Sequence, residues 1–293
     1  MTNEHATTRP VLATIILGCL LFIATVAGAG TPGVAISADG TPISYEVHGN
    51  GEPTLMLIHG WSCDARYWRA QLAPFADQYR VVTIDLAGHG HSGMGRENYT
   101  MRAFGEDVKA VADAVGGDRL ILVGHSMGGL VIAEAARLLP GRVLGLIGVD
   151  TLQNLEYPVT EEHAAEMLDP LEADFPVACR QFAAAMIRPD TDADLAEWIP
   201  ADMASAPAAV ALSAMREYMA QWVSGAGPVV FEELPLPVVS VCADMWPVDV
   251  EANRRHMHSF EAIVLEGTDH FLMLDSAEEF NQALEEAIAK IES

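Results

Sequence analysis

The residues with the clearest chemical potential surround Ser126, in the run Gly-His-Ser-Met-Gly over positions 124–128, which fits the pattern Gly-x-Ser-x-Gly. A serine in this pattern acts as a nucleophile when a sharp bend of the backbone projects its hydroxyl away from the chain. The two glycines permit that bend because they bring no Cβ atom into the crowded turn. A serine hydroxyl is a weak nucleophile at neutral pH, so the chemistry also requires a general base and a carboxylate that orients the base.

The segments on either side of Ser126 predict the context that such a bend needs. Residues 120–123 are a short aliphatic run that is typical of a buried strand. From Leu130 onward the chain is rich in Ala, Leu, Glu and Arg, which favour a helix. A serine placed between a strand and a helix in this way resembles the nucleophile of the α/β-hydrolase superfamily, in its serine-nucleophile branch.

This resemblance implies roles for further residues. Gly267 is followed three residues later by His270, as in the family's catalytic histidine loop, so His270 is the expected general base. The family holds the oxyanion with two backbone N–H groups, which here correspond to Trp61, shortly after the predicted strand 54–58, and Met127. Such donors are aimed in advance at the developing negative charge, and they therefore cost no reorganisation in the transition state.

The orienting acid is the point at which the sequence departs from the family pattern. The resemblance implies an acid between Ser126 and His270 in chain order, about three residues beyond a small residue that ends the strand after the cap. Counting from Ala243 gives Trp246, which has no carboxylate. Asp244 is the nearest carboxylate and is the expected acid, on the condition that the turn is two residues shorter than usual.

Two other aspartates remain open as the acid. Asp150 ends the predicted strand before the cap, where some members of the superfamily carry their acid, although a carboxylate at a strand end commonly only caps a turn. Asp249 lies near the start of a predicted helix, where the helix dipole favours an acid in any case. Asp150 is the main alternative to Asp244.

The spacing of apolar runs predicts an α/β fold with a mostly parallel central sheet flanked by helices, as in the α/β-hydrolase fold. The first part of this core is expected over residues 34–151 and the second over residues 234–293. Strands are expected within 34–47, as two strands around a turn, and at 54–58, 80–84, 120–123, 143–149, 237–243 and 262–265. Helices are expected at 66–76, at 104–115, from 130 onward, at 248–257 and at 277–291.

Between the two parts of the core, residues 152–233 contain seven prolines and no clear strand, and the segments between the prolines have helical patterns. A segment of this length exceeds a crossover connection, and it therefore predicts a helical cap inserted before the last two strands, over the ligand-binding edge of the sheet. The cap is rich in Met and aromatic residues, which suggest an apolar inner face and a partly apolar substrate. These residues are Met167, Phe182, Met186, Trp198, Met215, Met219 and Trp222.

Composition narrows the classes of partner. The chain has 293 residues, of which 51% are hydrophobic, and 41 acidic against 16 basic residues give a formal charge of −25. A nucleic acid backbone would be repelled by this charge, so the expected partner is a small-molecule substrate and not a nucleic acid. The oligomeric state stays open.

The cysteines and histidines do not predict a metal site. Outside the first thirty residues the cysteines are Cys63, Cys179 and Cys242, whose spacing fits no metal motif and whose odd number prevents complete pairing. Buried thiols are expected, with one disulfide as the alternative. His89 and His91 lie in the run Asp-x-x-Gly-x-Gly-x-Ser at 85–92, which resembles a turn of the family, so no metal or organic cofactor is expected.

The first 29 residues predict a signal peptide. Arg9 precedes an uncharged apolar run at 11–27, and Ala27-Gly28-Ala29 supplies the small residues that precede a cleavage site. The protein is therefore expected to be secreted or periplasmic. The alternative is an uncleaved anchor at residues 11–29, which would be the chain's only contact with a membrane.

Together these features predict a serine hydrolase that forms an acyl-enzyme on a small to medium, partly apolar carboxylic ester or lactone. The same residues would also serve an acyltransferase or a cofactor-free perhydrolase or haloperoxidase. Epoxide and haloalkane chemistry in this fold uses an aspartate nucleophile, against which Ser126 argues. A ligand-binding member of the fold without enzyme activity is the remaining alternative.

Overall fold

The computed structural model describes residues 30–293, and the predicted signal peptide at residues 1–29 lies outside this range. Within 30–293, none of the helices combines the length and the apolar character that crossing a bilayer requires.

A single sheet of eight strands forms the centre of the molecule, with the order β1-β2-β4-β3-β5-β6-β7-β8. The strands β3 to β8 run parallel, whereas β1 and β2 form an antiparallel hairpin at one edge and β2 pairs antiparallel with β4. The strands are β1 (Thr31–Ile36), β2 (Pro42–His48), β3 (Thr54–Ile58), β4 (Arg80–Ile84), β5 (Leu120–His125), β6 (Val143–Val149), β7 (Pro237–Ala243) and β8 (Ser259–Leu265). The predicted α/β fold with a mostly parallel sheet is confirmed.

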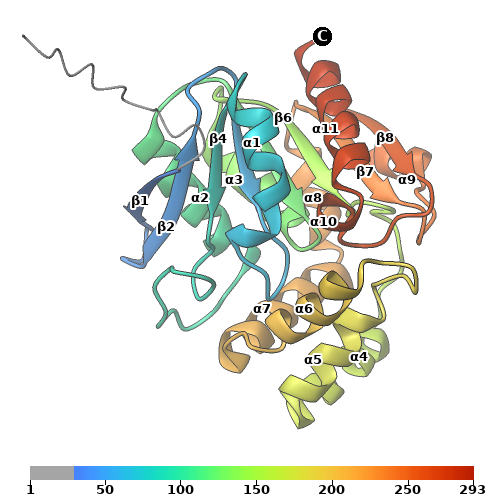
Figure 1. The fold of residues 1–293 in the computed structure, drawn as a ribbon. Coiled ribbons are helices and arrows are strands. Elements are labelled where there is room, and N and C mark those ends of the chain that lie inside the picture. Colours follow the sequence, from blue (N-terminus) through green and yellow to red (C-terminus); the bar gives the residue numbers. More distant parts are fainter. Residues whose placement is uncertain (1–29) are drawn as a thin grey trace, which may run out of the picture.

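Helices cover both faces of this sheet, which explains why the central strands β3 and β5 are buried along their whole length. Figure 1 shows α1 and α11 on one face and α2 and α3 on the other. The core helices are α1 (Arg69–Ala76), which follows the 3₁₀ helix η1 (Ala65–Trp68), α2 (Met101–Val115), α3 (Gly128–Leu138), α9 (Val250–His256), α10 (Leu272–Asp275) and α11 (Ala277–Glu292).

The segment between β6 and β7 folds into five helices, α4 to α8, and so confirms the predicted helical insertion before the last two strands. Figure 1 shows α4 to α7 gathered beyond one end of the sheet, where they form the cap. Asp174 and Asp192 begin α5 and α6, since each carboxylate accepts a backbone N–H of the first turn. The helices are α4 (Glu161–Ala173), α5 (Phe175–Ala184), α6 (Ala193–Met203), α7 (Ala208–Val223) and α8 (Ala226–Glu232).

The differences from the predicted elements are confined to their ends. The helix predicted at 66–76 begins as the 3₁₀ turn η1, which the Asp64 carboxylate caps by accepting the N–H of Arg66. The strand predicted at 262–265 begins at Ser259, because β8 pairs with β7 over all seven residues. Pairing with a neighbouring strand is not visible in local sequence, so the short prediction missed these residues.

Candidate active site

Ser126 lies where the carboxyl end of β5 meets the amino end of α3, and its φ angle is 53°. This left-handed conformation is unusual for a residue with a side chain. It persists because the surrounding structure holds the backbone in place. The Ser126 N–H donates to the carbonyl of Val149 on the neighbouring strand at 3.0 Å. The bend predicted from the Gly-x-Ser-x-Gly pattern is therefore present.

The glycines around Ser126 are required by close backbone contacts. A Cβ atom on Gly124 would lie 2.3 Å from the carbonyl oxygen of Gly128, and a Cβ atom on Gly128 would lie 2.9 Å from the carbonyl oxygen of Ile58. Any side chain at these two positions would force the strand and the helix apart. The sequence pattern thus reflects a steric requirement of the turn.

His270 and Asp150 form a buried pair beside this bend. The Nδ1 atom of His270 donates to Oδ2 of Asp150 at 2.5 Å, and the two side chains are 8% and 0% exposed. A carboxylate on Nδ1 keeps the proton on that nitrogen, so Nε2 of a neutral His270 is the basic atom. The pair can therefore accept a proton at Nε2 and stabilise the resulting imidazolium.

The carboxylate that contacts His270 belongs to Asp150, so the expectation that Asp244 orients the histidine does not match the geometry. Asp244 is 38% exposed, and its nearest cationic partner is the Arg188 guanidinium at 3.9 Å. Asp249 caps α9 by accepting the N–H of Ala252 at 2.9 Å, as its position at a helix start indicated. The turn after β7 is not shortened in a way that brings Asp244 to the histidine; instead Trp246 packs edge-on against the His270 ring at 5.8 Å.

The second carboxylate oxygen of Asp150 is also held. Its Oδ1 accepts the backbone N–H of Ala243 at 3.0 Å and the side-chain N–H of Gln153 at 3.3 Å. Asp150 has a φ of 41°, so the turn after β6 is bent in the same left-handed sense as the turn at Ser126. These contacts fix Oδ1, so the orientation of the carboxylate places Oδ2 where it accepts the Nδ1–H of His270.

The two expected oxyanion donors lie on loops next to Ser126. Within residues 30–293, no backbone carbonyl accepts a hydrogen bond from the N–H of Trp61 or of Met127. Both residues line the cavity that contains Ser126. The Trp61 ring is fixed by the cap, because its Nε1 donates to the carbonyl of Ala211 in α7 at 2.7 Å.

A cavity of about 160 Å³ lies between Ser126 and the cap, and most of its lining residues are apolar. The cap contributes the far wall, with side chains from α4, α5, α6, α7 and the segment after α5. The lining consists of Trp61, Cys63, His125, Ser126, Met127, Met167, Phe182, Met186, Met203, Met215, Tyr218, His270 and Phe271. Four of the cap residues expected on an apolar inner face are among them, whereas Trp198, Met219 and Trp222 are not.

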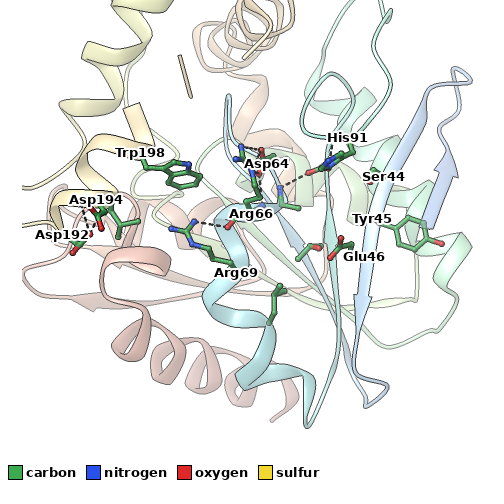
Figure 2. Close-up of a pocket in the computed structure, with 15 residues that line it drawn as sticks. Ser44, Tyr45, Glu46, Asp64, Arg66, Arg69, His91, Asp192, Asp194 and Trp198 are labelled. Carbon is green, nitrogen blue, oxygen red and sulfur yellow. Dashed lines mark hydrogen bonds and ion pairs between the residues drawn. The ribbon is translucent and has the colours of Figure 1, made fainter. Parts of the chain in front are cut away.

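A larger groove of about 700 Å³ lies elsewhere, between α6, α1 and the strands β2 and β4. Figure 2 shows Trp198 beside Arg69 in this groove, with His91 and Ser44 at its other end. Ser44 and His91 are not joined by a side-chain hydrogen bond in the described part of the chain, and Ser44 lies in regular strand β2. The groove therefore lacks the features that make Ser126 a candidate nucleophile.

His125, which sequence reasoning passed over, also contacts the site. Its Nε2 lies 2.9 Å from the carbonyl oxygen of His270, and because a carbonyl only accepts, Nε2 carries the proton. Burial, together with the nearby His270 ring, lowers the pKa of His125 well below its ordinary value, so the ring is neutral. The sequence feature that could have indicated this contact is the position of His125 directly before Ser126 in the Gly-x-Ser-x-Gly pattern.

Two further histidines are buried and neutral next to the site. His59 donates from Nδ1 to the carbonyl of Gly60 at 2.8 Å and accepts the Leu86 N–H at Nε2 at 3.0 Å, a pair of roles that only the neutral ring can fill. Burial lowers the pKa of His59, and burial with the neighbouring His59 ring lowers the pKa of His89 to about 3. Protonation of any of these rings therefore opposes folding.

This arrangement predicts a loss of stability in mild acid. The pKa of each ring is lower in the folded protein than its ordinary value of about 6.5, so between these values the unfolded chain binds more protons and stability falls as pH falls. His89, whose pKa in the folded protein is about 3, is expected to cost about 1.4 kcal/mol at pH 5.5 relative to pH 7.5. Urea unfolding at several pH values measures this dependence. In His89→Asn, the slope of the unfolding free energy against pH should fall by the equivalent of about one bound proton. An unchanged slope in that variant would show that His89 does not contribute.

The three cysteines of the described residues are Cys63, Cys179 and Cys242, and all three are buried and unpaired, as expected. Burial raises the pKa of the Cys242 thiol to about 12. In residues 30–293, no group of three or more His, Cys, Asp or Glu side chains is arranged to hold a metal ion.

Comparison with known proteins agrees with this geometry. Residues 55–283 match the model of the alpha/beta hydrolase family. The chain is 39% identical over 101 residues to a pimeloyl-[acyl-carrier protein] methyl ester esterase of Edwardsiella ictaluri, covering 34% of this chain and 37% of that protein. It is 33% identical over 120 residues to epoxide hydrolase 4 of Homo sapiens, covering 40% of this chain and 33% of that protein.

The structural likeness extends over almost the whole described chain. A thermophilic esterase from Thermogutta terrifontis superposes with a TM-score of 0.76 and 22% sequence identity, covering 90% of this chain and 100% of that one. By contrast, this chain aligns with only about a third of the length of each of the two sequence relatives. With the family model matched over residues 55–283, the chain belongs to the alpha/beta hydrolase family and has the fold of that family.

Proposed function

We propose that the protein is a serine hydrolase that cleaves small, partly apolar carboxylic esters or lactones through an acyl-enzyme on Ser126. One observation carries the proposal. The Asp150–His270 hydrogen bond of 2.5 Å lies beside a cavity that Ser126, on its left-handed bend, also lines. This combination provides a nucleophile, a base of defined tautomer and a carboxylate that stabilises the charged base.

In the proposed reaction, the Ser126 Oγ attacks the substrate carbonyl carbon while Nε2 of His270 takes the hydroxyl proton. The carbonyl oxygen becomes an oxyanion, which the N–H groups of Trp61 and Met127 stabilise. The intermediate then collapses, and the leaving alkoxide receives the proton from His270. Water repeats the sequence on the acyl-enzyme with His270 as its base, and this releases the acid and restores Ser126.

The cavity volume supports a small acyl group. A cavity of about 150 Å³ lined by aliphatic and aromatic side chains holds a molecule the size of benzene, so the 160 Å³ here suits an acyl chain of about four to six carbons. The methionine-rich cap wall favours apolar chains, because thioether side chains are apolar and adapt their shape.

A series of p-nitrophenyl esters of increasing acyl length tests this function. We expect kcat/KM to be highest near butanoate and to fall by at least about tenfold by decanoate, since one buried methylene changes the transition-state energy by about 1–3 kcal/mol in a closed pocket. Met203→Ala should enlarge the cavity at the cap wall and move the optimum to longer acyl chains. Met257 is buried outside the cavity, so Met257→Ala should leave the optimum unchanged. Absence of hydrolysis across the whole series would contradict the proposal.

Acyl transfer and perhydrolysis would use the same residues and differ only in the molecule that attacks the acyl-enzyme. Product analysis with added alcohol or hydrogen peroxide separates these reactions. A dominant ester or peracid product would replace hydrolysis as the principal activity while leaving the role of Ser126 intact.

A further inference from the structure

The loop that carries His270 is hydrogen-bonded to the cap through the segment 186–192, which joins α5 to α6. In this cap segment, the carbonyl of Met186 accepts the backbone N–H of His270 at 3.2 Å. The backbone N–H of Asp192 donates to the Asp275 carboxylate at 3.1 Å. One contact is thus made at the histidine itself and the other at the end of the short helix α10 that follows it.

Asp269, directly before His270, is the centre of this contact. Its carboxylate is fully buried and accepts three hydrogen bonds. The Thr191 hydroxyl donates to Oδ2 at 2.6 Å. The backbone N–H of Arg188 donates to Oδ2 at 3.4 Å, and the backbone N–H of Phe271 donates to Oδ1 at 2.7 Å. In the described part of the chain this carboxylate has no ion-pair partner within 4 Å, so it depends on these donors.

The shortest of the three bonds comes from the cap. A buried carboxylate that loses one donor either moves toward another donor or admits water, since its desolvation is then uncompensated. Asp269 cannot move without moving the adjacent His270. The backbone carbonyl of His270 is in turn fixed by the N–H of His125 at 2.9 Å, so a shift of this loop also strains the contact to the strand that carries Ser126.

We propose that Thr191 of the cap is a positioning residue for His270, acting through the Asp269 carboxylate. The proposal rests on the proposed function, in which His270 is the base. Thr191 touches neither Ser126 nor the Asp150 carboxylate in the hydrogen bonds of the structure, and it does not line the cavity. Its hydroxyl holds the His270 ring in the orientation that keeps Nδ1 on Asp150 and directs Nε2 toward Ser126. The position of the cap therefore affects the geometry of the catalytic residues.

Three variants separate this role from a general contribution to folding. Thr191→Val removes the hydroxyl and keeps the shape, and Thr191→Ser keeps the hydroxyl. Ser213→Ala is the matched control, because the Ser213 hydroxyl accepts the Tyr99 N–H at 3.1 Å and so joins the cap to the core through a hydrogen bond that does not involve the His270 loop. We expect Thr191→Val to lower kcat for p-nitrophenyl butanoate by about 10–100-fold with KM within about threefold, as misplacement of a reacting group by an ångström does. Thr191→Ser and Ser213→Ala should stay within about threefold of the parent enzyme.

A spectroscopic readout keeps the test independent of turnover. The Nδ1 proton of His270, in its short bond to Asp150, should give a downfield proton resonance, assigned by its loss in His270→Gln. We expect Thr191→Val to speed the exchange of this proton with water by at least about tenfold, and Ser213→Ala to leave it unchanged. Normal kcat and normal exchange in Thr191→Val, or equal losses in Ser213→Ala or Thr191→Ser, would overturn the proposal. An exchange effect in a protein that hydrolyses no ester would leave the positioning role standing and remove the proposed function.

Discussion

Ser126→Ala is expected to lower kcat for p-nitrophenyl butanoate by on the order of a millionfold, because it removes the atom that forms the acyl bond. The cavity lining contains no other serine or threonine hydroxyl, and burial raises the pKa of the lining Cys63 thiol well above its ordinary value, so this thiol stays protonated and does not replace Ser126. Binding is expected to persist, because the apolar cavity walls and the two backbone donors remain. The variant should therefore retain a Kd for a non-hydrolysable ester analogue close to the KM of the parent enzyme.

Ser224→Ala is the control for this experiment. The Ser224 hydroxyl donates to the carbonyl of Ala220 at the exposed end of α7 and has no contact with the site. Its removal should leave kcat within about twofold. A Ser126→Ala protein that retained more than about 1% of the parent kcat would show that a different group attacks the substrate.

Asp150→Asn is expected to lower kcat by about ten-thousandfold. An asparagine amide donates to the histidine ring, which moves the imidazole proton from Nδ1 to Nε2, so Nε2 can no longer accept the proton of the Ser126 hydroxyl. The amide oxygen can still accept the N–H of Ala243, so the turn after β6 should keep its shape. The melting temperature is therefore expected to change far less than the rate.

Asp244→Asn is the matched variant, because it makes the same chemical change at the position that the sequence favoured. Its carboxylate is 38% exposed and lies 3.9 Å from the half-buried Arg188 side chain, and ion pairs at the surface contribute little. We expect kcat within about threefold of the parent enzyme. A loss of a thousandfold or more at Asp244, with Asp150→Asn nearly active, would reverse the assignment of the acid.

Much of the fold followed from local sequence. The strands β3, β4, β6 and β7 have the predicted bounds, because each is a short apolar run bounded by turn or polar residues and is buried on both faces. The bend at Ser126 was predictable for the same reason, since the glycine spacing that permits it lies within five residues. His270 was indicated by a similarly local signal, the glycine three residues before it.

The acid was not predictable in this way. Asp150 and Asp244 both follow the last residue of a parallel strand, and β6 and β7 are neighbours, so both carboxylates start near the same edge of the sheet. The choice depends on non-local facts: the Ala243 N–H that turns Asp150 toward the histidine, and the Arg188 side chain from the cap beside Asp244. The contact of Thr191 with Asp269 joins residues 78 positions apart and left no pattern in the sequence.

The most direct test of the account is the site of covalent modification by a fluorophosphonate, a probe that reacts with activated serines. After labelling, digestion and peptide mass spectrometry, we expect one adduct, on Ser126, formed at a rate that falls strongly in Asp150→Asn and stays unchanged in Asp244→Asn. An unlabelled folded protein, or an adduct on another serine, would contradict the claim that Ser126 is the nucleophile.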